Sequence, residues 1–238
     1  MLRSLVGSEM CIRDSIYLVK YPMMVAMQQV PDAQGSVSGK MDDPLFRHRA
    51  VMALFEDSDS ANPRAQWNVL FRVEHLPGQP PFFLIQSSVA PVNLPEGAQM
   101  ISRELRLVPE GTPVAFRIAI NAVRRQNRDS GSDPGSNGGI KPVPFDGDEQ
   151  APESISRMTP WLQGKLAGGL SDLEIINHRR EVLGTSRQGR KTSQRVVQVD
   201  KVDGAAIVAD SAQLNKLILN GVGRAKSYGC GLLSVRQL

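Results

Sequence analysis

Histidine and cysteine, the residues that most often bind metals or act as nucleophiles, are scarce in this sequence. Its 238 residues include three histidines and two cysteines. Cys11 and Cys230 lie far apart and match no zinc or redox spacing. There is no HExxH motif and no carboxylate pair at ligand spacing. We therefore expect no disulfide framework, no metal and no cofactor.

Long apolar runs are also missing. No segment approaches the roughly 18 consecutive apolar residues that indicate a membrane-spanning helix. Residues 1–15 lack the continuous apolar stretch of a signal peptide and show no helix or strand periodicity. We expect these residues to be a non-native or disordered extension. The sequence predicts a cytoplasmic protein without a membrane partner.

Acidic residues are absent after Asp210 and nearly absent from the stretch 178–195, where Glu181 is the only one. The cations of that stretch are Arg179, Arg180, Arg187, Arg190, Lys191 and Arg195. Because the formal net charge is only +4, this excess is local. A solvated surface and a site for a polyanion both explain such a run, and the charge alone leaves both interpretations open.

The remaining composition, 41% hydrophobic and 22% charged, is typical of a folded protein. The length favours two small domains, since domains typically hold about 100 to 150 residues. Asp43 and Pro44 match the N-cap and first position of a helix in DDPLFRHRAVMALFED. Strand patterns surround this helix, at the start of 16–27 and at 67–76, 81–89, 102–108 and 112–123.

The second half repeats the mixture of strands and helices. We expect a helix over 153–167 interrupted near Pro160, a short helix over 212–221, and strands at 172–183, 195–209 and 231–235. The Gly/Ser/Pro-rich residues 126–152 predict a flexible linker or loop. The element order predicts an α+β fold of tandem ferredoxin-like (RRM-like) domains, one over 16–125 and one over 153–238.

His48 is the histidine that the helix pattern distinguishes. At about 100° per residue, it points roughly 150° away from the centre of the helix's apolar face. Between Arg47 and Arg49 it should lie on a basic, partly exposed surface, where an ordinary surface histidine remains an alternative. His75 and His178 are expected to be surface residues.

The segment GVGRAKSYGCGLLSV near the C-terminus is dense in glycine. Its glycines are Gly221, Gly223, Gly229 and Gly231. They follow a helix and precede a strand, which is the reverse of a dinucleotide-binding fingerprint. Glycine weakens a strand, so the cluster indicates that something approaches the backbone closely. Beside Arg224 and Lys226, a phosphate backbone is a candidate.

Two motifs carry a resemblance to a known family. DPLFRHRAVMALF (43–55) resembles the N-terminal helix of the CasE-type CRISPR-associated endoribonucleases of the type I-E Cascade system. GVGRAKSYGCGLLSV resembles the glycine-rich signature of the wider repeat-associated RNA-processing superfamily. Further similar segments are IYLVK (16–20), VLFRVE (69–74), LIQSS (84–88) and IAINAVRR (118–125). The resemblance extends over almost all of 16–238.

The resemblance implies a metal-independent endoribonuclease that cuts CRISPR precursor RNA at the 3′ base of the repeat stem-loop. Attack by a ribose 2′-OH would generate the mature crRNA, which stays bound to the enzyme within Cascade. The repeat RNA and other Cascade subunits are then the partners. His48 matches the catalytic histidine, either as acid to the leaving oxygen or as base to the 2′-OH, and Arg49 and Lys40 are candidates to stabilise the developing charge. The RNA-binding candidates are Arg124, Arg125, Arg187, Arg190, Lys191, Arg195, Gly221, Gly223, Arg224, Lys226, Gly229 and Gly231.

One position departs from the family pattern. Leu45 stands where many members have a tyrosine, three residues before the histidine. A second function therefore stays open, that of a non-catalytic subunit that holds the RNA hairpin. A third interpretation is a ferredoxin-like protein that binds proteins or small phosphates, whose RNA affinity would not depend strongly on salt.

Overall fold

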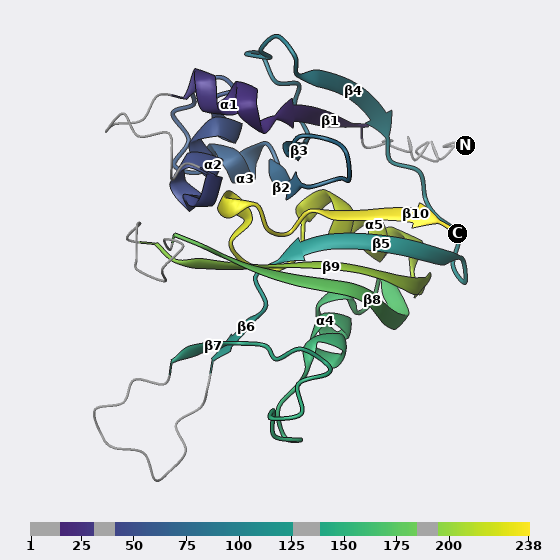
Figure 1. Ribbon diagram of the computed structural model, residues 1–238. Helices are drawn as coiled ribbons and strands as arrows, with labels where there is room; N and C mark the ends of the chain where they lie inside the picture. The colour runs from purple at the N-terminus through teal and green to yellow at the C-terminus, as the bar shows by residue number, and fades with distance from the viewer. Residues whose placement is uncertain (1–14, 31–40, 126–138, 185–194) are drawn as a thin grey trace, which may run out of the picture.

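The computed structural model describes residues 15–30, 41–125, 139–184 and 195–238. They form two four-stranded antiparallel sheets, one stacked above the other, and a two-stranded ribbon that projects below them (Figure 1). Expected features at 1–14 and 126–138 lie outside the described residues.

The first sheet has the strand order β2-β3-β1-β4. Its unit consists of β1 (Ser15–Pro22), α1 (Met23–Gln29), α2 (Pro44–Met52), α3 (Pro63–Gln66), β2 (Leu70–Glu74), β3 (Phe82–Ser87) and β4 (Gln99–Glu104). Val19 of β1 pairs with Ile85 of β3, and both side chains are fully buried. They join a core to which α2 contributes Phe46 and Val51. The apolar face expected for this helix thus covers the sheet.

The second sheet has the strand order β10-β5-β9-β8. Its unit consists of β5 (Pro113–Ile120), β6 (Val123–Arg125), β7 (Ile140–Pro142), α4 (Met158–Leu166), β8 (Leu170–Leu183), β9 (Val197–Val208), α5 (Ser211–Asn220), the short 3-10 helix η2 (Lys226–Tyr228) and β10 (Leu233–Gln237). In both sheets the first strand lies between the third and the fourth. The fold is therefore α+β with tandem ferredoxin-like units, as predicted.

The expected domain boundary is wrong for β5. Residues 112–123 were assigned to the first domain, but β5 pairs with β9 and β10 and forms the centre of the second sheet. Sequence pattern indicates that a segment is extended, whereas pairing depends on which core buries its side chains. Ile118 and Ile120 enter the core of the second unit. The change from one unit to the other falls between β4 and β5.

The expected linker is an insertion within the second unit. Its described part contains β7, which pairs with β6, and Val143, which is fully buried and bonds to Ala122. The helix expected at 153–167 begins only at Met158. Pro160 does not interrupt it, because a proline in the first turn removes no helical hydrogen bond.

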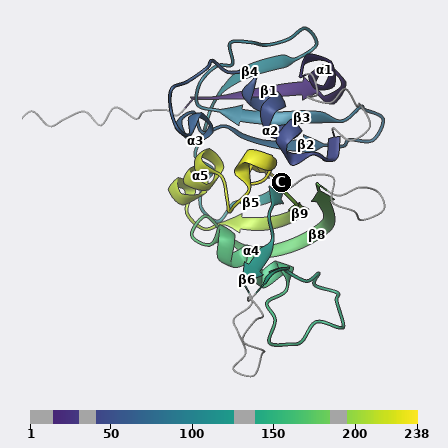
Figure 2. The ribbon, with the colours of Figure 1, turned by 90° about the vertical axis from the view of Figure 1, so that its left-hand side faces the viewer.

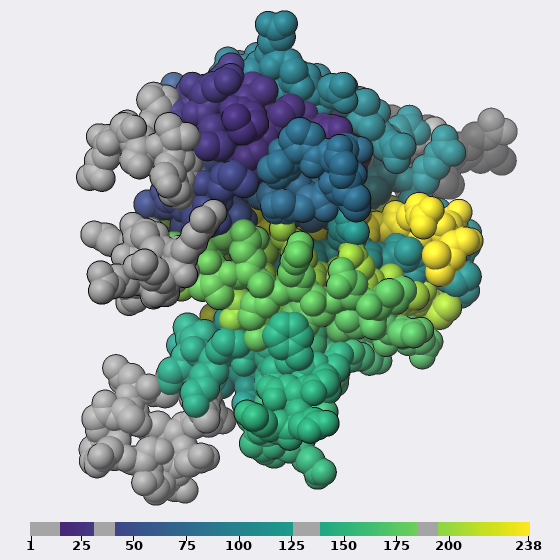
Figure 3. Space-filling view, viewed as in Figure 1, coloured from purple at the N-terminus to yellow at the C-terminus, as the bar shows by residue number. Residues whose placement is uncertain are grey.

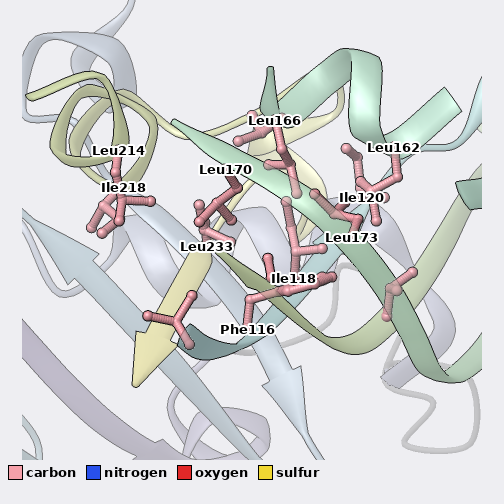
Figure 4. Packing of buried hydrophobic residues seen from close by; sticks show 14 of the residues in the cluster. Phe116, Ile118, Ile120, Leu162, Leu166, Leu170, Leu173, Leu214, Ile218 and Leu233 are labelled. Carbon is pink, nitrogen blue, oxygen red and sulfur yellow. The ribbon is translucent and has the colours of Figure 1, made fainter. Parts of the chain in front are cut away.

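The core of the second unit fills the space between its sheet and the helices α4 and α5. Figure 4 shows Leu162 and Leu166 of α4 and Leu214 and Ile218 of α5 among the buried residues of this cluster. The first unit rests directly on the second (Figure 3). The two ferredoxin-like units therefore meet along a continuous boundary.

Candidate active site between the two ferredoxin-like units

Helix α2 places His48 at the boundary between the units. The Asp43 carboxylate accepts the backbone N–H of Leu45 at 3.0 Å and caps the helix, and Pro44 occupies the first helical position. Phe46 enters the core, while His48 stays half-buried. The prediction that His48 lies outside the apolar core is confirmed.

Tyr228 of η2 contacts His48 from the second unit. The two ring centroids are 6.5 Å apart and the ring planes make an angle of 70°, an edge-on arrangement. The glycine-rich segment carries η2 to this place, directly beneath α2 (Figures 1 and 2). Arg195, which precedes β9, donates to the Tyr228 hydroxyl. His48 is thus held between its own helix and an arginine-tyrosine pair.

The surroundings of His48 favour its neutral form. Burial lowers the pKa of His48 below its usual 6.5, and the cations Arg64 and Arg195 lower it further, against a backbone hydrogen bond with Ser227 that raises it. Within the described part of the chain, the buried Nδ1 has no hydrogen-bond partner. An imidazolium ring has two N–H donors to satisfy, so the unpartnered nitrogen also disfavours the charged ring.

Arg47 does not lie on the basic surface that the sequence predicts. It is only 2% exposed, and its Nη2 lies 2.6 Å from Glu181 Oε1 of β8. Its Nε donates to the Met41 carbonyl at 2.8 Å. The Gly184 N–H also donates to the Asp42 carbonyl at 2.7 Å. The expectation for Arg47 is wrong because the guanidinium joins α2 to the end of β8.

Arg49 and Lys40 are the two cations that the sequence predicts to assist His48, and the structure describes only Arg49. Arg49 is surface-exposed, and its nearest carboxylate, that of Asp43, lies 4.0 Å away. Its guanidinium is accessible to an anionic ligand. Lys40 lies outside the described residues, so its role stays a prediction.

The glycine-rich segment is approached closely by protein. Its four glycines all have positive φ, between +71° and +96°. A Cβ on Gly221 would lie 2.6 Å from Leu70 Cδ2, and one on Gly229 would lie 3.2 Å from Phe71 Cε2. Both contacts are with β2 of the first unit. The close approach inferred from the sequence exists, but at these two positions the neighbour is the other unit.

Three of the predicted RNA-binding cations line one pocket. Arg124 and Arg125 of β6 meet Arg224 of the glycine-rich segment around a cavity of about 150 Å³. Lys165 and Trp161 of α4 also line this cavity. We call this cavity the basic pocket.

The predicted basic loop joins β8 to β9. Arg187, Arg190 and Lys191 lie outside the described residues, so their contacts with RNA stay predictions. Lys226 is half-buried, its Nζ donates to the Asn220 carbonyl at 2.7 Å, and burial lowers its pKa.

The sequence pattern of the family described as "CRISPR associated protein" matches residues 16–237. The chain belongs to this family. The CRISPR-associated protein is 28% identical over 197 residues to the CRISPR system Cascade subunit CasE of Escherichia coli strain K12, covering 80% of this chain and 90% of that protein. Its fold is similar to Thermus thermophilus Cse3 bound to an RNA representing a pre-cleavage complex, with a TM-score of 0.63 and 20% identity over 94% of this chain and 99% of that one. The Escherichia coli Cas6e structure matches with a TM-score of 0.60 and 23% identity, covering 94% and 100% of the respective chains.

Two neighbours of His48 in this CRISPR-associated protein could not be assigned to the site from the sequence. Tyr228 is an aromatic residue in the glycine-rich segment, and the sequence pointed to that segment without indicating a role for the tyrosine itself. Arg64 gave no signal, because it reaches His48 only through the tertiary arrangement of α3 and α2.

His178 is not the surface residue that the sequence predicts. Its side chain is 8% exposed, and its Nε2 lies 2.8 Å from Oδ1 of the fully buried Asp200. The Phe145 ring packs on it with centroids 4.2 Å apart. The chain between β7 and α4 brings Phe145 over this strand, which strand periodicity does not reveal. His75 is exposed, as predicted.

Among the described residues, no three His, Cys, Asp or Glu side chains are placed to hold a metal ion. In the same part of the chain, no helix combines the length and apolarity needed to cross a bilayer.

Proposed function

We propose that this protein is a metal-independent endoribonuclease that cuts CRISPR precursor RNA at the 3′ base of the repeat stem-loop and keeps the mature crRNA as a Cascade subunit. The observation that carries the proposal is the half-buried His48 at the boundary of the units, whose pKa is lowered by burial and by the cations Arg64 and Arg195. The Cascade subunit CasE of Escherichia coli, similar along most of the chain, supports the assignment.

Cleavage without a metal requires the RNA to supply its own nucleophile. The ribose 2′ oxygen attacks the adjacent phosphorus, the bond from phosphorus to the 5′ oxygen breaks, and a 2′,3′-cyclic phosphate and a 5′-OH result. The neutral His48 accepts the 2′-OH proton, and the departing 5′ oxygen takes a proton from water. The phosphate beside it raises the pKa of His48 once RNA is bound, which favours this transfer.

The cations around His48 stabilise the negative charge that develops on the phosphorane oxygens. Arg64 and Arg195 are close enough to the ring to lower its pKa, and Arg49 is exposed on the same helix as His48. Tyr228 fixes Arg195 through its hydroxyl. RNA-binding contacts are also proposed for Arg187, Arg190 and Lys191 of the basic loop. Because side chains cannot read the narrow major groove of A-form RNA, these cations recognise the shape of the stem through its phosphates.

The test is cleavage of the CRISPR repeat RNA of the source locus in EDTA. The wild-type protein should cut it, and His48→Ala should reduce the rate by about 10² to 10⁴ while leaving the affinity within a few fold. His75→Ala removes an exposed histidine elsewhere and serves as the matched control. A substrate with a 2′-deoxy group at the cut site should resist cleavage. Cleavage that appears only when Mg²⁺ is added would refute the mechanism.

Leu45 supports a second candidate, a subunit that holds the RNA hairpin without cutting it. Its side chain is 37% exposed at the start of α2, the helix that carries His48, and offers no hydroxyl to the site. Tight binding by the wild-type protein without cleavage would select this function. Cleavage gained in Leu45→Tyr would then trace the loss to this position.

A further inference from the structure

All charged side chains that line the basic pocket among the described residues are positive. Arg124, Arg125, Lys165 and Arg224 come from three separate parts of the second unit and face one cavity. Within the described chain, no acidic side chain lines this pocket. Four cations that converge with no carboxylate among the described lining residues repel one another, and an anion relieves that repulsion.

One of the cations that line the pocket also has a buried donor without an acceptor. In the part of the chain that the structure describes, Arg124 Nε is buried and has no hydrogen-bond partner. Buried N–H groups are almost always paired in native proteins, so the Arg124 guanidinium is incompletely satisfied within the described chain. A phosphate in the pocket would pair with the cations that line it.

Trp161 gives the pocket an apolar wall. Its indole packs partly against the core of the second unit, and Lys165 Nζ lies 5.5 Å from the ring centroid. An apolar wall excludes water and lowers the local dielectric, which strengthens the attraction between the cations and a phosphate. The lining therefore favours a single anionic group over a broad solvated surface.

The pocket and His48 share the glycine-rich segment. Arg224 lines the pocket, while Tyr228 contacts the His48 ring. The four residue steps from Arg224 to Tyr228 span at most about 14 Å of backbone. An RNA strand whose scissile phosphate lies at His48 therefore has other phosphates within reach of the pocket.

We propose that the basic pocket binds one phosphate of the strand that is cut, a few nucleotides from the scissile bond, and thereby sets the position of that strand at His48. This inference rests on the proposed function and extends it to Lys165 and Trp161, neither of which the sequence predicts. The pocket holds the strand by its backbone, so it acts regardless of base identity.

The test compares repeat RNAs that each carry one neutral methylphosphonate linkage near the cut site. Binding is measured with His48→Ala as the parent protein, so that cleavage does not interfere. One linkage should weaken binding to the parent roughly tenfold, as expected for loss of a charged hydrogen bond. The same linkage should have no effect on the parent with Lys165→Gln and Arg224→Gln, because the contact is already lost.

The matched control carries Lys20→Gln and Arg236→Gln, which remove two exposed charges elsewhere. It should keep the sensitivity of the parent to that one linkage. An unchanged sensitivity in the Lys165→Gln/Arg224→Gln protein overturns the inference, while failure of the wild-type protein to bind the repeat overturns the proposed function. A third result is that inorganic phosphate protects the wild-type protein from thermal unfolding while no methylphosphonate linkage weakens RNA binding. This result would assign the pocket to a free anion and would also overturn the inference.

Discussion

At the scale of single residues, the neighbours that set the pKa of His48 belong to three different segments. Arg64 lies in α3, Arg195 precedes β9 and Ser227 lies in η2. Burial and the two cations lower the pKa, so the ring is neutral at neutral pH. A neutral ring acts as a base until the pH falls through its lowered pKa.

Removal of one cation should raise the pKa of His48. In Arg64→Gln, we expect an NMR titration of the His48 ring to show a higher pKa than in the wild type. As the pH is lowered, the variant should lose cleavage activity at a higher pH than the wild type, because its His48 is protonated at a higher pH. Arg103→Gln, on the exposed strand β4, is the control. An unchanged or lower pKa in Arg64→Gln would contradict this account of the site.

The glycines of this chain differ in what a methyl group would meet. Gly221 has a φ of +71°, and its Cβ would lie 2.6 Å from Leu70 Cδ2. Gly164, inside α4, has nothing within 4 Å. We expect Gly221→Ala to lower the free energy of unfolding by about 1 to 3 kcal/mol and Gly164→Ala to raise it by about 0.5 to 1 kcal/mol. Urea unfolding measures both, and equal effects would show that backbone conformation and packing at Gly221 are unimportant.

At the scale of elements, the ion pair between Arg47 of α2 and Glu181 of β8 positions the helix that carries His48. Burial raises the pKa of Glu181, but Arg47 and then Lys201 outweigh it, and the pKa ends below its usual 4.5. A carboxyl group with a lowered folded-state pKa stabilises the fold above its unfolded pKa. That contribution is lost as the pH falls through the lowered value.

Breaking this ion pair should destabilise the protein. Arg47→Met leaves Glu181 without its main partner, and we expect a loss of about 3 kcal/mol in the free energy of unfolding at pH 7. Arg49→Met, at an exposed neighbouring position, should change it by less than about 0.5 kcal/mol. The loss should shrink as the pH falls through the lowered pKa of Glu181, because the wild type then loses the ion pair as well. A pH-independent loss would show that Arg47 acts through packing alone.

At the scale of the whole molecule, buried polar bonds fix the two units to each other. Arg72 of β2 donates to the Leu232 carbonyl at 3.2 Å and to Ser234 Oγ at 2.9 Å. Gln86 Nε2 of β3 donates to the Ile218 carbonyl at 2.8 Å. Separation of the units would leave these groups unpaired or newly hydrated. The site at their boundary depends on this attachment.

The two units should therefore unfold together. Calorimetry of the wild-type protein should show one transition whose calorimetric and van't Hoff enthalpies agree. Arg72→Met should lower the free energy of unfolding by about 3 kcal/mol and separate the transition into two. Arg103→Met, on the exposed edge strand, should leave a single transition. Two transitions in the wild type would show that the boundary does not couple the units.

Much of this architecture follows from the sequence. The Asp-Pro start of α2, the apolar face of that helix and the positions of most strands are local patterns, because each reflects backbone preference and burial on one face. The resemblance of the first and last motifs singled out His48 and the glycine-rich segment. Pairing of β5 with the second sheet was not predicted, since an extended apolar segment suits either core.

The sequence by itself determined the chemistry that is available: one distinctive histidine, an excess of cations towards the C-terminus and glycines that permit positive φ. Only the tertiary structure decided which of these groups meet. It turned Arg47 into an ion pair with Glu181, buried His178 against Asp200, and brought Arg64, Arg195 and Tyr228 to His48. Long-range contacts and desolvation create these relations, and neither is encoded in the pattern of neighbouring residues.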